Sequence, residues 1–473
     1  TNQRTDRFGG SFEGRLQFVK EIIEGIRSAC GNEFTLGIRL TVDELLAPNG
    51  VEEYLKLEDG VRVCKELEAL GLDFINVSNG IYESFNSLSE PTTYPQGCRT
   101  PLIRAVKEAV NIPVIAVNMI KEPWFAEKML EEELVDFVGL GRAVVADPEW
   151  AKKAMEEREE EINRCISCTF CFETLVSDAI GGIGPVKCAV NPRAGREHKY
   201  PEYKKDGEGK TVVIVGAGVA GLEAARVLAE RAFHVVVLEK EGKVGGQINV
   251  ANRPPHKEKM NWIVDYELVQ LKKLGVSVQA NVEATKEVIA SYNPYAVILA
   301  TGGAPIKPSS IPGINLENAV TFKDVLCEEK VIEGKKVAVI GSGATGLETA
   351  EYLCTRGNDV TIVEMKDSIG EGVYVQHYLD AMDKLSKYDV TYMDKTKLVE
   401  IKKDAVVLEQ VKEGTTSEYP VDYVVLSLGV RSVNLLEEVA KEVCDNVFVI
   451  GDASKVGRIE GAVRSGFEVA YSL

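Results

Sequence analysis

One strand–turn–helix–strand pattern occurs twice in this chain, and it restricts the fold more than any other feature. The first copy is "KTVVIVGAGVAGLEAARVLAERAFHVVVLEK" (210–240), and the second is "KKVAVIGSGATGLETAEYLCTRGNDVTIVEM" (335–365). A strand that runs through G-x-G-x-x-G into a helix is the unit that binds a dinucleotide. Its glycines permit a tight turn, a close approach of pyrophosphate to the backbone, and close helix–strand packing. We therefore predict two nucleotide-binding domains related by internal duplication.

In each copy an acidic residue ends the second strand. Glu239 lies 23 residues after Gly216, and Glu364 lies 23 residues after Gly341. A carboxylate at this place can bind a ribose hydroxyl, while the helix N-terminus faces the phosphates. The predicted dinucleotide contacts are the three glycines and the acid of each copy: Gly216, Gly218, Gly221, Glu239, Gly341, Gly343, Gly346 and Glu364.

Four cysteines are grouped just before the first copy. "RCISCTFC" holds Cys165, Cys168 and Cys171, and Cys188 follows in "GPVKCAVNP". A C-x₂-C-x₂-C run with one distant partner favours a [4Fe–4S] cluster. Zinc, which usually takes two separated C-x₂-C pairs, and purely structural thiols stay open as alternatives. We expect the other six cysteines to be reduced and mostly in the core: Cys30, Cys64, Cys98, Cys327, Cys354 and Cys444.

The first 155 residues alternate between short apolar runs and helical patterns. The runs are "FTLGIRL", "LDFINVS", "IPVIAVN" and "VDFVGLG", with helices expected at Val61–Leu70 and Trp124–Glu133 and an earlier one whose apolar face carries Phe18 and Ile22. Such alternation predicts parallel strands with crossover helices, and four units are half of a (β/α)₈ barrel. Because the chain opens at Thr1 in mid-motif, we expect N-terminal truncation, with about four further units upstream.

Charge and hydropathy exclude several classes of partner. The formal net charge of −18 argues against nucleic acid and against an anionic membrane surface. No apolar run is long enough for a membrane helix, and no secretory signal is visible. We expect a cytoplasmic protein that acts on a small molecule, and a homo-oligomer is compatible with the sequence.

Two further stretches assign the dinucleotides by resemblance. "GGQI" (245–248) and the strand-end Gly-Asp of "NVFVIGDAS" resemble the FAD domain of two-dinucleotide flavoproteins, which implies FAD contacts by Gly246, Gln247, Gly451 and Asp452. The second copy resembles the inserted NAD(P)H domain of disulfide-reductase-like flavoproteins. The charge of Glu364 opposes an NADP 2′-phosphate, so NADH is favoured over NADPH.

The N-terminal part resembles the old yellow enzyme family through "TNQRTDRFGGSFEGR", "GIRLT" and "VGLGRAVVADPEW" (138–150). With the cysteines and the two dinucleotide domains, the whole chain resembles the multidomain branch, which includes 2,4-dienoyl-CoA reductase, 2-enoate reductase, trimethylamine dehydrogenase and bile-acid NADH:flavin oxidoreductases. The resemblance implies that Arg39 lies beside the FMN ring and that Gly141 and Arg142 bind its phosphate. It also implies that the four grouped cysteines ligate the cluster. Asn118 stands where the family has a glycine-containing turn, and its side chain is expected to crowd the phosphate.

The fold prediction is therefore α/β, combining the C-terminal half of a TIM barrel, an iron–sulfur segment and two Rossmann-like domains. The expected boundaries are 1–155 (FMN domain), 156–205 (cluster segment and linker), 206–318 (FAD domain), 319–408 (NAD(P)H domain) and 409–473 (return to the FAD domain). The resemblance implies that the substrate-anchoring His/Asn-type pair and the proton-donating Tyr lie upstream of Thr1. Residues 1–164 contain no histidine, and the catalytic proton donor stays unassigned.

The resemblance implies an NADH-dependent ene reductase that passes electrons from NADH through FAD, the [4Fe–4S] cluster and FMN to an α,β-unsaturated carbonyl, enoate or enoyl-CoA. One alternative is an amine or steroid (bile-acid) dehydrogenase of the same architecture that sends electrons outward. Another is a truncated chain in which only the FAD/NADH diaphorase half functions.

Overall fold

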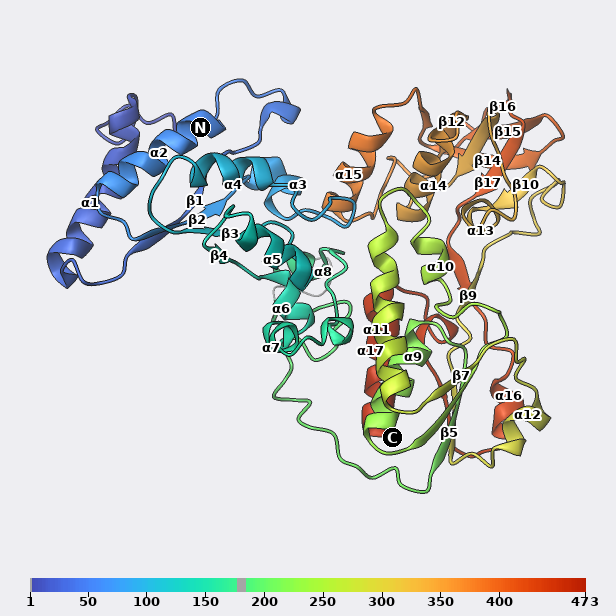
Figure 1. The fold of residues 1–473 in the computed structure, drawn as a ribbon. Coiled ribbons are helices and arrows are strands. Elements are labelled where there is room, and N and C mark those ends of the chain that lie inside the picture. The colour runs from blue at the N-terminus through green and yellow to red at the C-terminus, as the bar shows by residue number, and fades with distance from the viewer. Residues whose placement is uncertain (1, 177–183) are drawn as a thin grey trace. The chain divides into compact units, whose positions relative to one another are not determined.

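The computed structural model describes residues 2–176 and 184–473 (Figure 1). The chain divides into two compact units, residues 1–159 and 160–473.

The first unit is built on a four-stranded parallel sheet in the order β1-β2-β3-β4. Its strands are β1 (Gly37–Thr41), β2 (Phe74–Ser78), β3 (Val114–Ala116) and β4 (Phe137–Val138). The helices around them are α1 (Phe12–Cys30), α2 (Leu57–Ala69), α3 (Phe85–Leu88), α4 (Thr100–Lys107), α5 (Pro123–Glu131), α6 (Arg142–Ala146) and α7 (Trp150–Met155). Each strand pairs with the next one in the chain, which confirms the predicted β–α alternation.

The helix boundaries differ slightly from the sequence-based ones. α2 begins at Leu57 rather than Val61, because Glu58 and Asp59 lie in its first turn, where acidic groups stabilise the N-terminus. The predicted helix at this segment is α1, but the residues with the predicted spacing do not face the core. Phe18 and Ile22 are 59% and 44% exposed, while Ile23 is 4% exposed.

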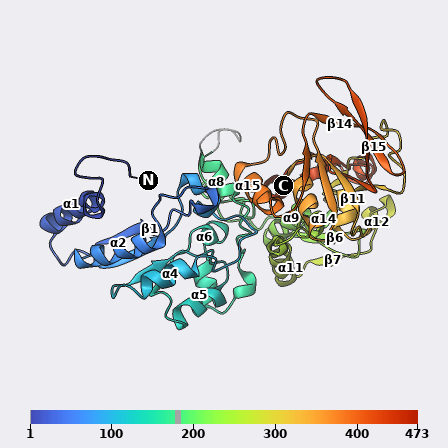
Figure 2. The ribbon, with the colours of Figure 1, turned by 90° about the horizontal axis from the view of Figure 1, so that it is seen from above.

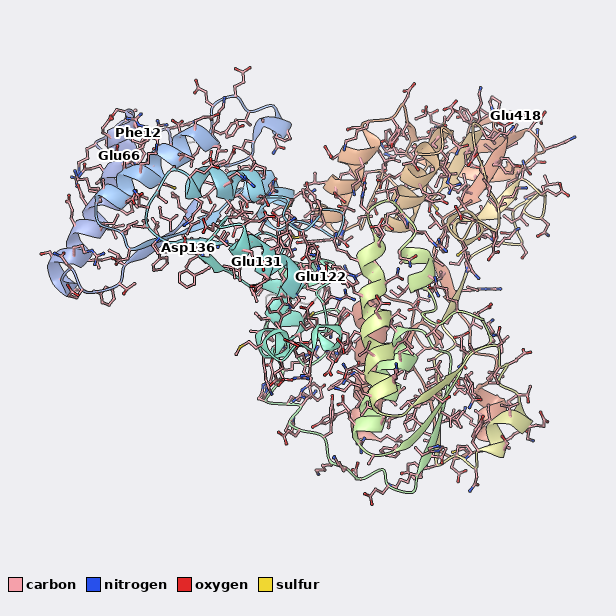
Figure 3. The ribbon with its side chains drawn as sticks, viewed as in Figure 1. Phe12, Glu66, Glu122, Glu131, Asp136 and Glu418 are labelled. Atoms are coloured by element: carbon pink, nitrogen blue, oxygen red, sulfur yellow. The ribbon has the colours of Figure 1, made fainter. Side chains whose placement is uncertain are left out.

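One carboxylate ties three elements of this unit together. Asp136, labelled in Figure 3, directly precedes β4 and accepts a hydrogen bond from the Lys107 ammonium at 2.7 Å. It also accepts one from the Val114 backbone N–H at 2.7 Å. The side chain therefore links the end of α4 to the starts of β3 and β4.

The second unit begins, after α8 (Phe170–Val176), with a five-stranded parallel sheet in the order β19-β8-β5-β6-β7. Its strands are β5 (Thr211–Val215), β6 (His234–Leu238), β7 (Ser277–Gln279), β8 (Ala296–Leu299) and β19 (Val447–Val449). Helices α9 (Val219–Glu230), α11 (Trp262–Lys273) and α17 (Ile459–Ser472) pack side by side against it (Figure 1). The last strand and the last helix thus return from the chain's end to complete the first nucleotide-binding domain.

A second five-stranded parallel sheet has the order β10-β17-β11-β12-β13. Its strands are β10 (Ala319–Thr321), β11 (Lys336–Ile340), β12 (Asp359–Val363), β13 (Thr391–Met393) and β17 (Tyr423–Leu426). The antiparallel strands β14 (Thr396–Ile401), β15 (Ala405–Gln410) and β16 (Thr416–Pro420) belong to the same domain, as do α13 (Phe322–Leu326), α14 (Ala344–Cys354) and α15 (Val375–Leu385).

The chain enters and leaves this inserted domain through a two-stranded antiparallel pair, β9 (Gly303–Pro305) with β18 (Val430–Ser432). The expected boundary at residue 409 falls inside β15, and β17 beyond it still pairs with β11. The strand run at 423–426 therefore belongs to the inserted sheet, and the return begins at β18.

Both dinucleotide-domain sheets have near-continuous apolar strands, as expected for parallel strands covered on two faces. Val212, Val213 and Ile214 are fully buried in β5, as are Ala338 and Val339 in β11. Among the scattered cysteines, burial raises the pKa of Cys64 to about 12 and that of Cys354 to about 11, in keeping with core thiols. Cys30 is exposed at the end of α1, so the expectation of a core position is wrong for it. Within the described ranges, none of the helices combines the length and apolarity needed to cross a bilayer.

Candidate cofactor sites

The glycines of the first fingerprint serve two different needs. A Cβ on Gly216 would lie 2.4 Å from the carbonyl oxygen of Ala300, and one on Gly221 would lie 2.0 Å from that of Gly216. Packing against the protein therefore demands these two glycines. By contrast, the nearest atom to a Cβ on Gly218 is the Cα of Gly246, at 3.9 Å. The bare backbone at Gly218 leaves the space that a pyrophosphate needs at the N-terminus of α9.

The second fingerprint repeats this division. Cβ atoms on Gly341 and Gly346 would lie 2.5 Å and 2.0 Å from backbone carbonyl oxygens, whereas one on Gly343 would meet nothing within 4 Å. Gly343 is the N-cap of α14, and no side chain caps its first turn. The two loops therefore fit a dinucleotide in the same way.

The two acids sit at matching places in the duplicated units. The Glu239 carboxylate accepts the backbone N–H of Ala217 at 2.8 Å, inside the first glycine loop. The Glu364 carboxylate accepts the backbone N–H of Ser342 at 2.9 Å and its hydroxyl at 2.7 Å. Burial would raise the pKa of Glu364, but the bonds from Ser342 and Lys366 outweigh it and hold that pKa below its usual value. Glu364 is therefore ionised at neutral pH.

Gln247 and Asp452 come together although 205 residues separate them. The Gln247 amide donates to one Asp452 carboxylate oxygen at 2.6 Å, and the Gly457 N–H donates to the other at 3.0 Å. Gly246 (φ +54°) lies against Gly218, and Gly451 (φ +60°) lies against Ala220 on α9. The residues implied for FAD therefore border one fingerprint loop.

The sequence reasoning missed the N-terminus of α17 beside Gly451. Arg458 is the N-cap of this helix and supplies no side-chain cap. A cavity of about 430 Å³ opens there, lined by Gly451, Arg458, Gly461 and Ser465 among others. The sequence could have indicated this terminus, because a helical pattern starts just after the Gly-Asp strand end. The N-terminus of a helix offers backbone N–H donors to an electron-rich part of a ligand.

The four grouped cysteines converge in the structure. Burial, and then the nearby thiols of Cys168, Cys165 and Cys171, raise the pKa of Cys188 well above its usual value. All three thiols of the tight run therefore lie near Cys188. The Ser167 N–H points at the Cys165 sulfur at 3.4 Å. Four neighbouring thiols, of which Cys165 is buried and the other three are partly exposed, suit a metal group that binds thiolates.

The arrangement speaks against a single shared ion. Within residues 2–176 and 184–473, no three His, Cys, Asp or Glu side chains are placed to hold one metal ion. A mononuclear zinc site needs all its sulfurs within bonding distance of one atom. In a four-iron cluster each thiolate instead binds its own iron.

Charged contacts fix the cysteine segment to the first nucleotide-binding domain. The Arg458 guanidinium binds both carboxylate oxygens of Glu173 on α8, at 2.7 and 3.2 Å. Arg164, next to Cys165, lies 4.7 Å over the ring of Trp262 at the start of α11. The segment is thus held at both of its ends within the second unit.

The residues implied for FMN lie on opposite edge strands of the first unit. Arg39 is exposed on β1 and donates to the Asn76 side chain of β2 at 2.5 Å. Gly141 and Arg142 follow β4, and a Cβ on Gly141 would meet nothing within 4 Å.

The loop after β3 is shaped differently from the expectation for Asn118. Its side chain is 1% exposed, accepts the Arg99 N–H at 2.7 Å and donates to Thr100 at 3.0 Å. It therefore points away from the loop's open side. The next residue, Met119, adopts φ +56° and contacts the Arg142 guanidinium. The turn is made without glycine.

Fold and sites together define a flavin-dependent oxidoreductase with two dinucleotide-binding domains. Residues 1–161 match the NADH:flavin oxidoreductase / NADH oxidase family, and residues 210–466 match the pyridine nucleotide-disulphide oxidoreductase family. The chain is 41% identical to the NADH oxidase of Thermoanaerobacter brockii over 478 residues, covering 100% of this chain and 72% of that protein. It is 33% identical to the cinnamate reductase of Clostridium sporogenes, covering 100% of this chain and 71% of that protein.

Among solved structures, 2-naphthoyl-CoA reductase in complex with 2-naphthoyl-CoA matches 100% of this chain and 70% of its own, with a TM-score of 0.92 and 30% identity. The protein thus belongs to the NADH:flavin oxidoreductase / NADH oxidase family, in the form that carries a pyridine nucleotide-disulphide oxidoreductase domain. It is an oxidoreductase with flavin- and pyridine-nucleotide-binding domains.

Proposed function

We propose that the protein is an NADH-dependent ene reductase that acts on an α,β-unsaturated carboxylate or acyl thioester. Two proteins similar to this chain, a cinnamate reductase and a 2-naphthoyl-CoA reductase, have names that support this substrate class. The observation that carries the proposal is the convergence of four thiols in the segment between the FMN-type unit and the two dinucleotide domains. When bound, NADH, FAD, a [4Fe–4S] cluster and FMN would supply hydride and single-electron transfer in that order.

The chain's own residues bind and orient these groups. Gly218 and the Gln247–Asp452 pair would hold FAD, and Gly343 with Glu364 would hold NADH. Cys165, Cys168, Cys171 and Cys188 would ligate the cluster. Arg39 and Arg142 would place positive charge at the FMN ring and phosphate, where it stabilises an anionic reduced flavin.

The second fingerprint supports electron flow from NADH toward the substrate. Its loop is open at Gly343, and its acid is ionised and fixed by Ser342. A site built to admit NADH supports reduction of the substrate over an outward flow of electrons from an amine or steroid.

A Cys168→Ala variant tests the proposal. NADH should still bleach the FAD absorbance at the parental rate, because the FAD and NADH residues are untouched, while NADH-driven reduction of an α,β-unsaturated carboxylate such as cinnamate should stop. Cys354→Ala, which removes a buried thiol from α14, is the matched control. Parental alkene reduction by Cys168→Ala would overturn the proposed electron path.

A further inference from the structure

The second nucleotide-binding domain contacts the cysteine segment directly through α15 (Figure 2). The His377 Nε2 atom lies 3.1 Å from the carbonyl oxygen of Cys168 and 3.4 Å from the hydroxyl of Thr169. Tyr374, the N-cap of α15, places its ring edge-on to that of His377 at 5.9 Å. No pattern in the sequence relates this helix to the cysteines, and the proposed chemistry makes no use of it.

The geometry assigns the donor. A backbone carbonyl oxygen accepts only, so the His377 Nε2 atom must carry the hydrogen. The Thr169 hydroxyl donates to the same carbonyl at 2.8 Å. The peptide oxygen of Cys168 therefore accepts two hydrogen bonds, and one of them comes from another domain.

The cysteine loop needs such support. Ser167 and Thr169, the two neighbours of Cys168, have φ values of +54° and +55°. Residues with a side chain rarely adopt this left-handed conformation, which costs on the order of 1 kcal/mol or more each. Both residues are almost fully buried. A contact that fixes the intervening peptide offsets part of this strain.

The same helix is connected to the nucleotide end of its own domain. The Ser342 hydroxyl, which donates to Glu364, accepts the backbone N–H of Gly370 at 2.9 Å. Gly370 lies in the link between β12 and α15, where a Cβ would sit 2.4 Å from the ring of Tyr378. A hydrogen bond and a close packing contact therefore lead from the ribose-binding carboxylate to the helix that carries His377.

We propose that His377 is a positioning residue, through which the second nucleotide-binding domain holds the Cys168 loop in its metal-binding conformation and transmits nucleotide occupancy to the cysteine segment. The proposal rests on the proposed cluster at the four cysteines. It adds a coupling between two sites, one at Glu364 and one at Cys168, by way of a single helix.

The first test compares His377→Ala with His377→Gln, using the exposed His198→Ala as control. Iron and sulfide content, the electron paramagnetic resonance (EPR) spectrum of the reduced protein and amide hydrogen exchange are measured on each holoprotein. In His377→Ala, the amides of residues 166–172 should exchange at least about tenfold faster, and the EPR signal should shift or broaden. Gln can donate to the same carbonyl and should restore much of both properties. If His377→Ala does not fold, His377→Leu, which fills the site without a hydrogen-bond donor, takes its place in the same readouts.

The second test adds ADP-ribose, a redox-inert part of NADH, to the reduced protein. It should change the EPR signal and the exchange of residues 166–172 in the parent, and change neither in His377→Ala. If the purified parental protein contained no iron, the proposed cluster would be wrong. An iron-containing parent whose loop exchange and EPR signal are unaltered by His377→Ala would overturn only the role of His377. A response to ADP-ribose that persists in His377→Ala would overturn the coupling.

Discussion

The side-chain amide of Gln247 donates a 2.6 Å hydrogen bond to the carboxylate of Asp452, and this bond joins two segments that are 205 residues apart. Asp452 also accepts the N–H of Gly457, so both of its oxygens are engaged. The pair lies beside the glycine loop of the first nucleotide-binding domain. Gln247 follows Gly246, which packs on Gly218, and Asp452 lies shortly after β19.

Asp452→Asn should therefore weaken FAD retention. The substitution removes the charge that makes these hydrogen bonds strong, and bonds to charged groups contribute about 1.5–3 kcal/mol, so the Kd for FAD should rise at least about tenfold. FAD released from the purified variant, measured by chromatography against protein concentration, checks this. Asp383→Asn, at an exposed site on α15, should keep parental FAD. Stoichiometric, tightly held FAD in Asp452→Asn would refute the assignment.

Glu364→Gln should reduce the preference for NADH over NADPH. The ionised carboxylate repels a 2′-phosphate by on the order of 1 kcal/mol, which corresponds to a roughly fivefold change in the ratio of kcat/KM values. NADH- and NADPH-driven bleaching of FAD measures that ratio. Glu371→Gln removes an exposed carboxylate from the same loop, and it should leave the ratio unchanged. An unaltered ratio in Glu364→Gln would show that this carboxylate does not discriminate between NADH and NADPH.

The geometry of the two glycine loops could be predicted from the sequence because it is local. The spacing of Gly216, Gly218 and Gly221 encodes a turn, and the acid that ends the next strand must return to the same sheet edge. The structure places Glu239 on the loop N–H of Ala217, as that logic requires.

The contacts that sequence reasoning did not find are those between elements without a shared pattern. His377 and Cys168 are 209 residues apart, and neither belongs to a periodic run that points to the other. The helical spacing of α1 was predicted, but not the partner of its apolar side chains: Phe18 packs on Phe8 rather than in the core, and no 3.6-residue pattern distinguishes these two outcomes.

The holoprotein should contain about four iron and four sulfide per chain when purified without oxygen, because four thiolates in this spacing suit a cubane cluster. Cys188→Ala removes the thiol that faces the other three and should lose most of the iron and the visible cluster absorbance. Elemental analysis of parent, Cys188→Ala and Cys354→Ala makes the comparison. Stoichiometric zinc without iron in the parent would defeat the prediction.

Glu351 on α14 should make the inserted domain less stable as pH rises. Burial raises the pKa of Glu351 to about 7, with Lys384 opposing this. Between the ordinary pKa near 4.5 and about 7, the folded state binds more protons than the unfolded state, so the free energy of unfolding falls as pH increases through this window and levels off above it. Glu351→Gln removes the titration. The difference in free energy of unfolding between this variant and the parent should therefore be more favourable to the variant at pH 8 than at pH 4.5, by on the order of 2 kcal/mol.

Apparent Tm values at the two pH extremes measure this difference. The exposed Glu329→Gln should follow the parent at both. A Glu351→Gln variant with the same pH dependence as the parent would show that the carboxyl is ionised throughout.

Two glycines of the second fingerprint separate binding from folding. A Cβ on Gly343 meets nothing within 4 Å, and its φ of −62° suits any residue, so Gly343→Ala should fold with a Tm within a few degrees of the parent. The added methyl group would occupy the space where pyrophosphate approaches the helix N-terminus, so the KM for NADH should rise at least about tenfold.

Gly346→Ala instead drives a Cβ to 2.0 Å from the Gly341 carbonyl oxygen, and it should lower the Tm of the inserted domain. Thermal unfolding together with NADH titration of FAD bleaching distinguishes the two. Parental NADH affinity in a folded Gly343→Ala would mean that no dinucleotide approaches this loop.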